Sequence, residues 1–116
     1  MQLYLNCISK FGGLNYGISI CKYTGVRGKG GASDASAEVM RHIRTTFDNA
    51  GVIWQIATLG KVDQGGGGTV AAYMANRNIP TVDAGVPVLS MHAPLELVSK
   101  LDCYETMLAC KAIYLA

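Results

Sequence analysis

Residues 17–23 read GISICKY and residues 52–58 read VIWQIAT, and both segments have the residue pattern of a β-strand. The first segment alternates small or polar residues with apolar ones, and the second is rich in β-branched and aromatic residues. A loop with four glycines (24–31) and an amphipathic segment (33–50) separate them. A strand, a loop, a helix and a second strand in this order predict an α/β unit.

The helix between these strands has signals at both ends and one apolar face. Ser33 is the expected N-cap, and Asp34 places a negative charge in the first turn, where the helix dipole favours it. Gly51 is expected to end the helix, because glycine adopts the left-handed backbone of a C-terminal cap without strain. The apolar face has four members at helical spacing: Val39, Met40, Ile43 and Phe47.

The same alternation continues in the second half of the chain. A helix is predicted at about 69–78, and Pro80 cannot continue it. A short strand follows at 81–88, and a last helix starts near Leu95 or Ser99. The apolar stripe expected along this last helix consists of Leu101, Tyr104, Leu108, Ala112 and Leu115.

This alternation predicts a parallel or mixed sheet with helices packed on its faces. Residues 1–13 fit no element of the pattern, so the expected domain runs over residues 14–116. Ligands of such sheets bind at the carboxyl ends of the strands. We therefore expect the loops at 24–31, 59–68 and 89–94 to gather at one end of the sheet and to form the site.

The composition argues against several classes of protein. Of 116 residues, 50% are hydrophobic and 16% are charged, a balance opposite to that of disordered chains. Ten basic and eight acidic residues give a net charge of +2, which does not favour nucleic acid or an anionic membrane as a partner. The mean hydropathy of +0.24 is high, so either much of the chain is buried or its apolar surface contacts something outside this sequence. No stretch approaches the ~20 apolar residues that span a bilayer.

The four cysteines form no CxxC pair and have no zinc-finger spacing. Cys103 and Cys110, seven residues apart on one side of the last helix, are expected to be small core residues. Reduced cysteines are typical of a reducing compartment. Because the first residues also lack the features of a secretory signal, the sequence predicts a cytoplasmic protein.

A run of glycines offers one candidate binding site. Gly65 to Gly68, followed by Thr69, precede a predicted helix, so backbone N–H groups and the helix dipole could bind an anion there. The same glycines could instead allow the backbone to pass close to another backbone or to a ligand. No lysine precedes Thr69, so the run is not a Walker A loop.

The two histidines differ in their expected roles. His92, in the loop after the third strand, is either a hydrogen-bonded loop residue or a metal ligand or acid–base group. His42, on the polar side of the first helix, is expected to face solvent. The acids near these loops are scattered at Asp63, Asp83 and Glu96, so spacing alone reveals no complete catalytic set.

Several segments in the same order resemble the C-terminal region of M18 metalloaminopeptidases, and most closely the bacterial aminopeptidase I and aspartyl aminopeptidase branch. These segments are CKYTG (21–25), RGK (27–29), ASDASAE (32–38), LGKVDQGGGGT (59–69), DAGV (83–86) and LSMHAP (89–94). The resemblance covers roughly residues 14–116. The glycine run and the Ser-Met-His segment make it specific.

The resemblance implies a three-layer α/β sandwich and a two-zinc exopeptidase that removes N-terminal residues from peptides. Other divalent metals are compatible with such a site, and the family commonly forms large homo-oligomers. The histidine of the Ser-Met-His segment, here His92, is the last metal ligand of the family. The substrate side of the site is expected to include Lys22, Asp63, Gly66, Gly67, Gly68, Thr69 and Met91.

The chain also departs from the family, because the remaining metal ligands lie upstream of the matching region and are absent here. We therefore expect the 116-residue chain alone to be inactive, since one ligand cannot hold a catalytic metal. An alternative is a non-catalytic fragment that associates with a full-length relative or only folds. A weaker alternative is an independent anion-binding module that uses the start of the helix after Gly68.

Overall fold

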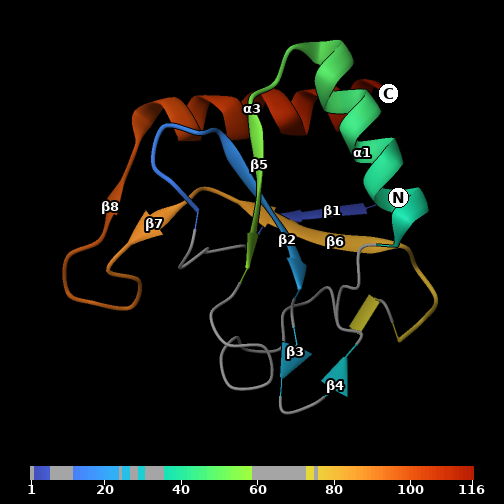
Figure 1. The fold of residues 1–116 in the computed structure, drawn as a ribbon, viewed down its shortest axis with the longest axis horizontal. Helices are drawn as coiled ribbons and strands as arrows, with labels where there is room; N and C mark the ends of the chain where they lie inside the picture. Colours follow the sequence, from blue (N-terminus) through green and yellow to red (C-terminus); the bar gives the residue numbers. More distant parts are fainter. Residues whose placement is uncertain are drawn as a thin grey trace.

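A computed structural model describes residues 2–5, 12–23, 25–26, 29–30, 36–58, 73–74 and 76–116 (Figure 1). The strands are β1 (Gln2–Leu5), β2 (Ile18–Tyr23), β3 (Gly25–Val26), β4 (Lys29–Gly30), β5 (Trp54–Thr58), β6 (Thr81–Gly85), β7 (Val88–Leu89) and β8 (Leu97–Val98). The long helices are α1 (Ala37–Ala50) and α3 (Lys100–Leu115). Half of the helix predicted at 69–78 lies outside the described residues; Tyr73 and Met74 are helical, whereas residues 76–78 form a turn, so the helix does not reach the predicted end.

The main sheet has the order β1-β6-β2-β5 and is mixed, which confirms the predicted α/β class. β2 pairs in parallel with β5, with Ile18 opposite Trp54. β6 pairs in parallel with β1 but antiparallel to β2. The carboxyl ends of β2 and β5 therefore lie at one end of the sheet, and the carboxyl end of β6 lies at the other. The prediction that three loops gather at one end is wrong for the loop at 89–94, because apolar patterning does not encode strand direction.

One apolar cluster joins the sheet to both long helices. Its buried members come from β2, α1, β6, α3 and the segment before β5: Ile18, Ile20, Ile43, Phe47, Val52, Val82, Ala84 and Ala109. Val39 and Met40 are partly buried and pack against this cluster, so the predicted apolar face of the first helix is confirmed. His42 on the same helix is exposed, as predicted.

The first helix begins later than the sequence suggested. Its N-cap is Ser36 rather than Ser33, and the Ser36 hydroxyl accepts a hydrogen bond from the backbone N–H of Val39 at 3.3 Å. The acid of the first turn is accordingly Glu38, not Asp34; hydrogen bonds from its own backbone N–H and from the Ser36 side chain lower the pKa of Glu38. Two serines three residues apart are equally good caps by chemistry. Gly51 ends the helix with a φ of 67°, as predicted.

The last helix begins at one of the two predicted places, and only part of its predicted apolar stripe packs on the core. Ser99 is its N-cap, and its buried residues are Asp102 and Ala109. Leu108 and Ala112 of the predicted apolar stripe are partly buried and pack against the core, as expected. The other three members are exposed: Leu101 (64%), Tyr104 (55%) and Leu115 (75%). Apolar residues occur almost all round this helix, so their spacing could not identify the buried side.

Two carboxylates of α3 hold the segments that lead into β2 and β5. Fully buried Asp102 accepts the backbone N–H groups of Asn15 and Gly17, each at 2.8 Å. Glu105, one turn further along, accepts the backbone N–H of Ile53 at 2.9 Å. These bonds satisfy backbone donors that precede the strands, and they fix α3 across the amino ends of β2 and β5 (Figure 1).

We expect Asp102→Ala to lower the free energy of unfolding by about 3 kcal/mol, because it leaves one buried and one partly buried N–H donor without an acceptor. Asp102→Asn retains one acceptor oxygen and should cost roughly half as much. Glu105→Ala, which removes one bond at a half-buried site, is the matched control and should cost about 1 kcal/mol. Urea denaturation of the three variants measures these differences. Equal effects of Asp102→Ala and Glu105→Ala would contradict this role of Asp102.

The cysteines do not form the reduced core predicted from the sequence. Cys21 is fully buried in β2 and is disulfide-bonded, so it is not the reduced core residue that the sequence predicted. Cys103 is a free, exposed thiol rather than a core residue. Cys110 is free and half-buried, and burial raises the pKa of its thiol. The seven-residue spacing that placed both thiols on one side of the helix did not specify which side is buried.

Iodoacetamide should therefore alkylate Cys103 several times faster than Cys110 in the folded chain at pH 8. The thiolate is the reactive form, and a raised pKa lowers its fraction at this pH while partial burial restricts access. Mass spectrometry of peptides from timed samples measures both rates, and urea-unfolded protein is the control in which the rates should converge. Faster labelling of Cys110 in the folded chain would contradict the described orientation of α3.

None of the helices within the described ranges combines the length and apolar character needed to cross a membrane.

Candidate functional site

His92 lies in the β7–β8 loop (residues 90–96). The flanking strands pair antiparallel, with Val88 opposite Val98 and Leu89 opposite Leu97, so the loop is closed at its base. The side chain of His92 is exposed, and no described residue hydrogen-bonds its imidazole ring. Met91 beside it is half-buried. Both ring nitrogens of His92 thus remain available to a ligand.

The backbone of this loop is strained at two residues. Ser90 and His92 have positive φ values of 58° and 65°, a region that favours glycine and costs other residues roughly 1–2 kcal/mol. The backbone N–H of Ala93 donates to the carbonyl of Ser90 at 3.0 Å, which closes a tight turn over Met91 and His92. Strain of this kind is retained where the surroundings enforce it, and it is common at binding sites.

Glu96 supplies one enforcing contact. Its Oε1 accepts a hydrogen bond from the backbone N–H of His92 at 2.6 Å. A hydrogen bond to a charged group contributes about 1.5–3 kcal/mol, less where solvent competes as at this exposed residue. The bond is therefore of the same order as the cost of the left-handed backbone at His92. From the sequence alone Glu96 is one of several scattered acids, although a carboxylate four residues after a loop histidine is a signal for such a contact.

The chemistry of His92 fits one ligand of a zinc ion. Zinc binds neutral imidazole nitrogen readily, and a catalytic zinc has three protein ligands and one open position. In the part of the chain that the structure describes, no three His, Cys, Asp or Glu side chains come together. A complete metal site would therefore need ligands from outside the described residues.

The other residues expected at the site are only partly placed. Lys22 lies close to the carboxyl end of β2. Because β2 and β6 are antiparallel, this is the opposite end of the sheet from the carboxyl end of β6. Asp63, Gly66, Gly67, Gly68 and Thr69 lie outside the described residues. The described residues thus bring His92 together with Met91 and Glu96, and they do not bring Lys22 to this loop.

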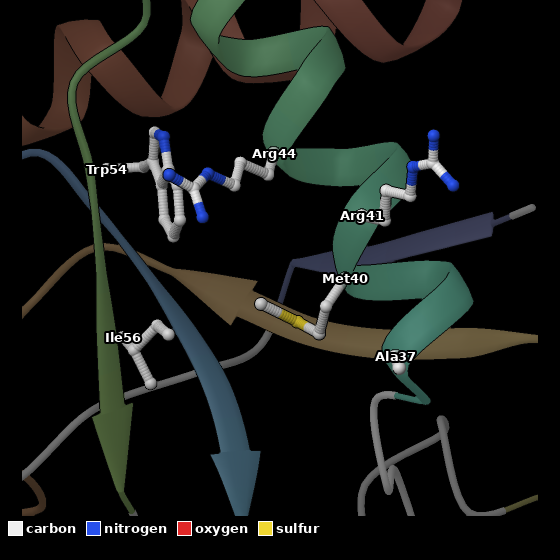
Figure 2. A pocket seen from close by; sticks show the side chains of 6 residues that line it. All are labelled: Ala37, Met40, Arg41, Arg44, Trp54 and Ile56. Carbon is white, nitrogen blue, oxygen red and sulfur yellow. The ribbon is translucent and has the colours of Figure 1, made fainter.

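A second surface feature is a groove of about 310 Å³ between α1 and β5 (Figure 2). It is lined by Ala37, Met40, Arg41, Arg44, Trp54 and Ile56. Asp48 accepts from the Trp54 indole N–H at 2.9 Å and pairs with Arg44 at 3.6 Å. This groove was not predicted from the sequence. Its signal is the pair Trp54 and Ile56, alternate residues of β5 that face the same side of the sheet as α1. None of the residues expected at the site lies in it.

Comparison with known proteins identifies relatives that match most of the chain. Residues 8–114 match the model of the family described as aminopeptidase I zinc metalloprotease (M18). A probable M18 family aminopeptidase 1 of Borreliella burgdorferi is 54% identical over 101 residues, which are 87% of this chain and 22% of the relative. The protein of the same name from Thermotoga maritima is 49% identical over 100 residues, covering 86% of this chain and 22% of that relative.

Solved structures agree with the sequence relatives. The crystal structure of the M18 aminopeptidase from Thermotoga maritima matches with a TM-score of 0.78 at 49% identity, over 86% of this chain and 22% of that one. A dodecameric PhTET1 structure matches with a TM-score of 0.71 at 19% identity, over 97% of this chain and 30% of that one, a likeness of fold alone. The chain thus spans about a fifth of the length of its curated relatives. Because the family model covers nearly all of its 116 residues, the chain belongs to the M18 aminopeptidase family.

Proposed function

We propose that this chain is part of the catalytic domain of a zinc-dependent aminopeptidase, in which His92 binds a metal through a ring nitrogen. The observation that carries this proposal is the match of residues 8–114 to a family described as zinc metalloproteases. The exposed imidazole of His92, with no described hydrogen-bond partner and with a strained backbone, supports the assignment of the ligand. A site with two zinc ions is the finer form of the proposal, and other divalent metals are compatible with it.

The roles of the chain's own residues follow from this assignment. A bound zinc would polarise the scissile carbonyl and lower the pKa of water. The neutral imidazole of His92 would hold the metal, and the β7–β8 loop would fix the direction of the ring. Met91 would line the side that receives the peptide, together with residues outside the described ranges: Asp63, Gly66, Gly67, Gly68 and Thr69. Lys22 has no part in this surface within one chain, because it lies at the other end of the sheet. The remaining ligands would come from outside the described residues.

The proposal is tested by exchanging the matching segment of the Thermotoga maritima relative for this chain, which gives a full-length hybrid. We expect the hybrid to bind zinc and to release N-terminal residues from peptides, and we expect the 116-residue chain alone to do neither. Metal analysis and a peptide assay on the same samples measure both properties. A hybrid that folds but binds no zinc would contradict the proposal. Turnover by the isolated chain would show that the 116 residues complete a site by themselves.

Assembly into a homo-oligomer is a further part of the proposal. One structural neighbour is a dodecamer and another assembles into a tetrahedron or an octahedral shell, according to their descriptions. In this chain α3 and β8 expose several large apolar side chains: Leu97, Leu101, Tyr104, Met107, Tyr114 and Leu115. A surface of this kind is typical of an interface.

A second candidate function is a non-catalytic fragment that associates with a full-length relative. The same exposed apolar residues on α3 favour it, because they would be covered in such a complex. Gel filtration of the chain, alone and mixed with the Thermotoga maritima relative, separates the two candidates. Co-elution without any change in the relative's activity would favour the second candidate, and elution as an independent monomer would count against it.

A further inference from the structure

We propose that Glu96 is a positioning residue for His92. The carboxylate of Glu96 holds the backbone of the β7–β8 loop and so sets the direction in which the imidazole of His92 projects from the loop. This inference rests on the proposed role of His92 as a metal ligand. Among the described residues, Glu96 is the one whose side chain hydrogen-bonds to His92, and it does so at the backbone N–H with a distance of 2.6 Å.

The backbone conformation of His92 decides where its ring can reach. At a φ of 65° the Cα–Cβ bond points in a different direction from that in an extended or right-handed helical residue. The left-handed region costs a histidine free energy, whereas glycine adopts it about as readily as regions of negative φ. When the bond to Glu96 is lost, His92 is therefore free to return to the commoner regions, and its ring turns away from the direction set by the turn.

The position of Glu96 suits it to this task. It directly precedes β8, and the pairing of Leu97 with Leu89 anchors the chain at that point. The acceptor, the carboxylate of Glu96, is thus attached to the paired base of the loop. The donor, the backbone N–H of His92, lies at the strained turn. Because the contact uses the backbone N–H, both ring nitrogens of His92 stay available.

The first test measures hydrogen exchange of the His92 amide by NMR in the ¹⁵N-labelled 116-residue chain. Glu96→Ala should speed this exchange about tenfold, the factor expected for one net hydrogen bond. Glu96→Gln keeps an acceptor oxygen and should restore most of the protection. Glu105→Ala is the matched control, since it removes the same kind of bond at Ile53 and should leave the His92 amide unchanged. Unchanged exchange at His92 in Glu96→Ala would overturn the proposal.

The second test measures the zinc dissociation constant of the full-length hybrid by competition with a chelator. Glu96→Ala should raise this constant roughly 10–100-fold, the usual effect of removing a group that orients a ligand, and Glu96→Gln should raise it much less. An unchanged constant in Glu96→Ala would overturn the positioning role. If His92→Ala leaves zinc binding unchanged, the proposed function fails instead, and the exchange measurement still decides whether Glu96 holds the loop.

Discussion

His92→Ala in the full-length hybrid is expected to lower kcat/KM about 10³-fold, because a lost ligand releases the metal and with it several kcal/mol of charge stabilisation in the transition state. Peptide hydrolysis at saturating and at low substrate concentrations gives kcat and kcat/KM, and metal analysis of the same sample gives the zinc content. The zinc content and kcat/KM are expected to fall together. The readout is direct because His92 is exposed and does not contribute to the apolar core.

The chain contains its own control for this substitution. His42, the other histidine, is exposed on α1 and lies outside the β7–β8 loop. His42→Ala should leave both zinc content and kcat/KM unchanged within error. If His92→Ala behaved like His42→Ala, the histidine of the Ser-Met-His segment would not be a ligand in this protein, and the resemblance on which that role rests would not extend to its site.

Gly17→Ala is expected to lower the free energy of unfolding by more than about 4 kcal/mol, enough to prevent stable folding. A Cβ atom at Gly17 would lie 1.9 Å from the carbonyl oxygen of Ile53 and 2.4 Å from its carbonyl carbon. Both contacts are to backbone, so no side-chain rotation relieves them. The same carbonyl accepts the N–H of Ile18 at 3.1 Å, and the substitution would therefore push apart β2 and β5 where their pairing begins.

Gly51→Ala separates this steric effect from the effect of backbone conformation. Gly51 also has a positive φ, 67° against 81° at Gly17, but a Cβ atom there would meet nothing within 4 Å. Its substitution should cost only about 1 kcal/mol, the strain of a left-handed residue. Urea denaturation and a ¹⁵N NMR spectrum of each variant give stability and foldedness. Equal costs at the two glycines would mean that the close approach at Gly17 is not maintained in solution.

The elements of the fold were predictable where local chemistry is unambiguous. The segments 17–23 and 52–58 form β2 and β5, and the apolar residues of α1 face the core as their spacing indicated. Gly51 ends α1 because few other residues adopt the left-handed backbone so readily. The N-cap of α1 was less predictable, since Ser33 and Ser36 offer the same hydroxyl and only tertiary packing selects between them.

The candidate site was predictable in one residue and not in its geometry. His92 stood out because it is one of two histidines and lies in a loop after a strand. Its left-handed backbone and the bond from its N–H to Glu96 depend on the pairing of β7 with β8, two strands of two residues each that no pattern signalled. The direction of β6 likewise depends on its pairing with β1 and β2, strands far from it in the chain.

By itself, the sequence determined the α/β class, the main strands, the apolar face of α1 and the family, because these depend on local propensity, periodicity and short segments of fixed order. The tertiary structure decided the direction of β6, the buried face of α3 and the strained turn at His92. Each of these depends on contacts between residues far apart in the chain, such as Asp102 with Gly17, or on the closing of a loop, as with Glu96 and His92. Such contacts arise only when the packing free energies of several elements are satisfied together.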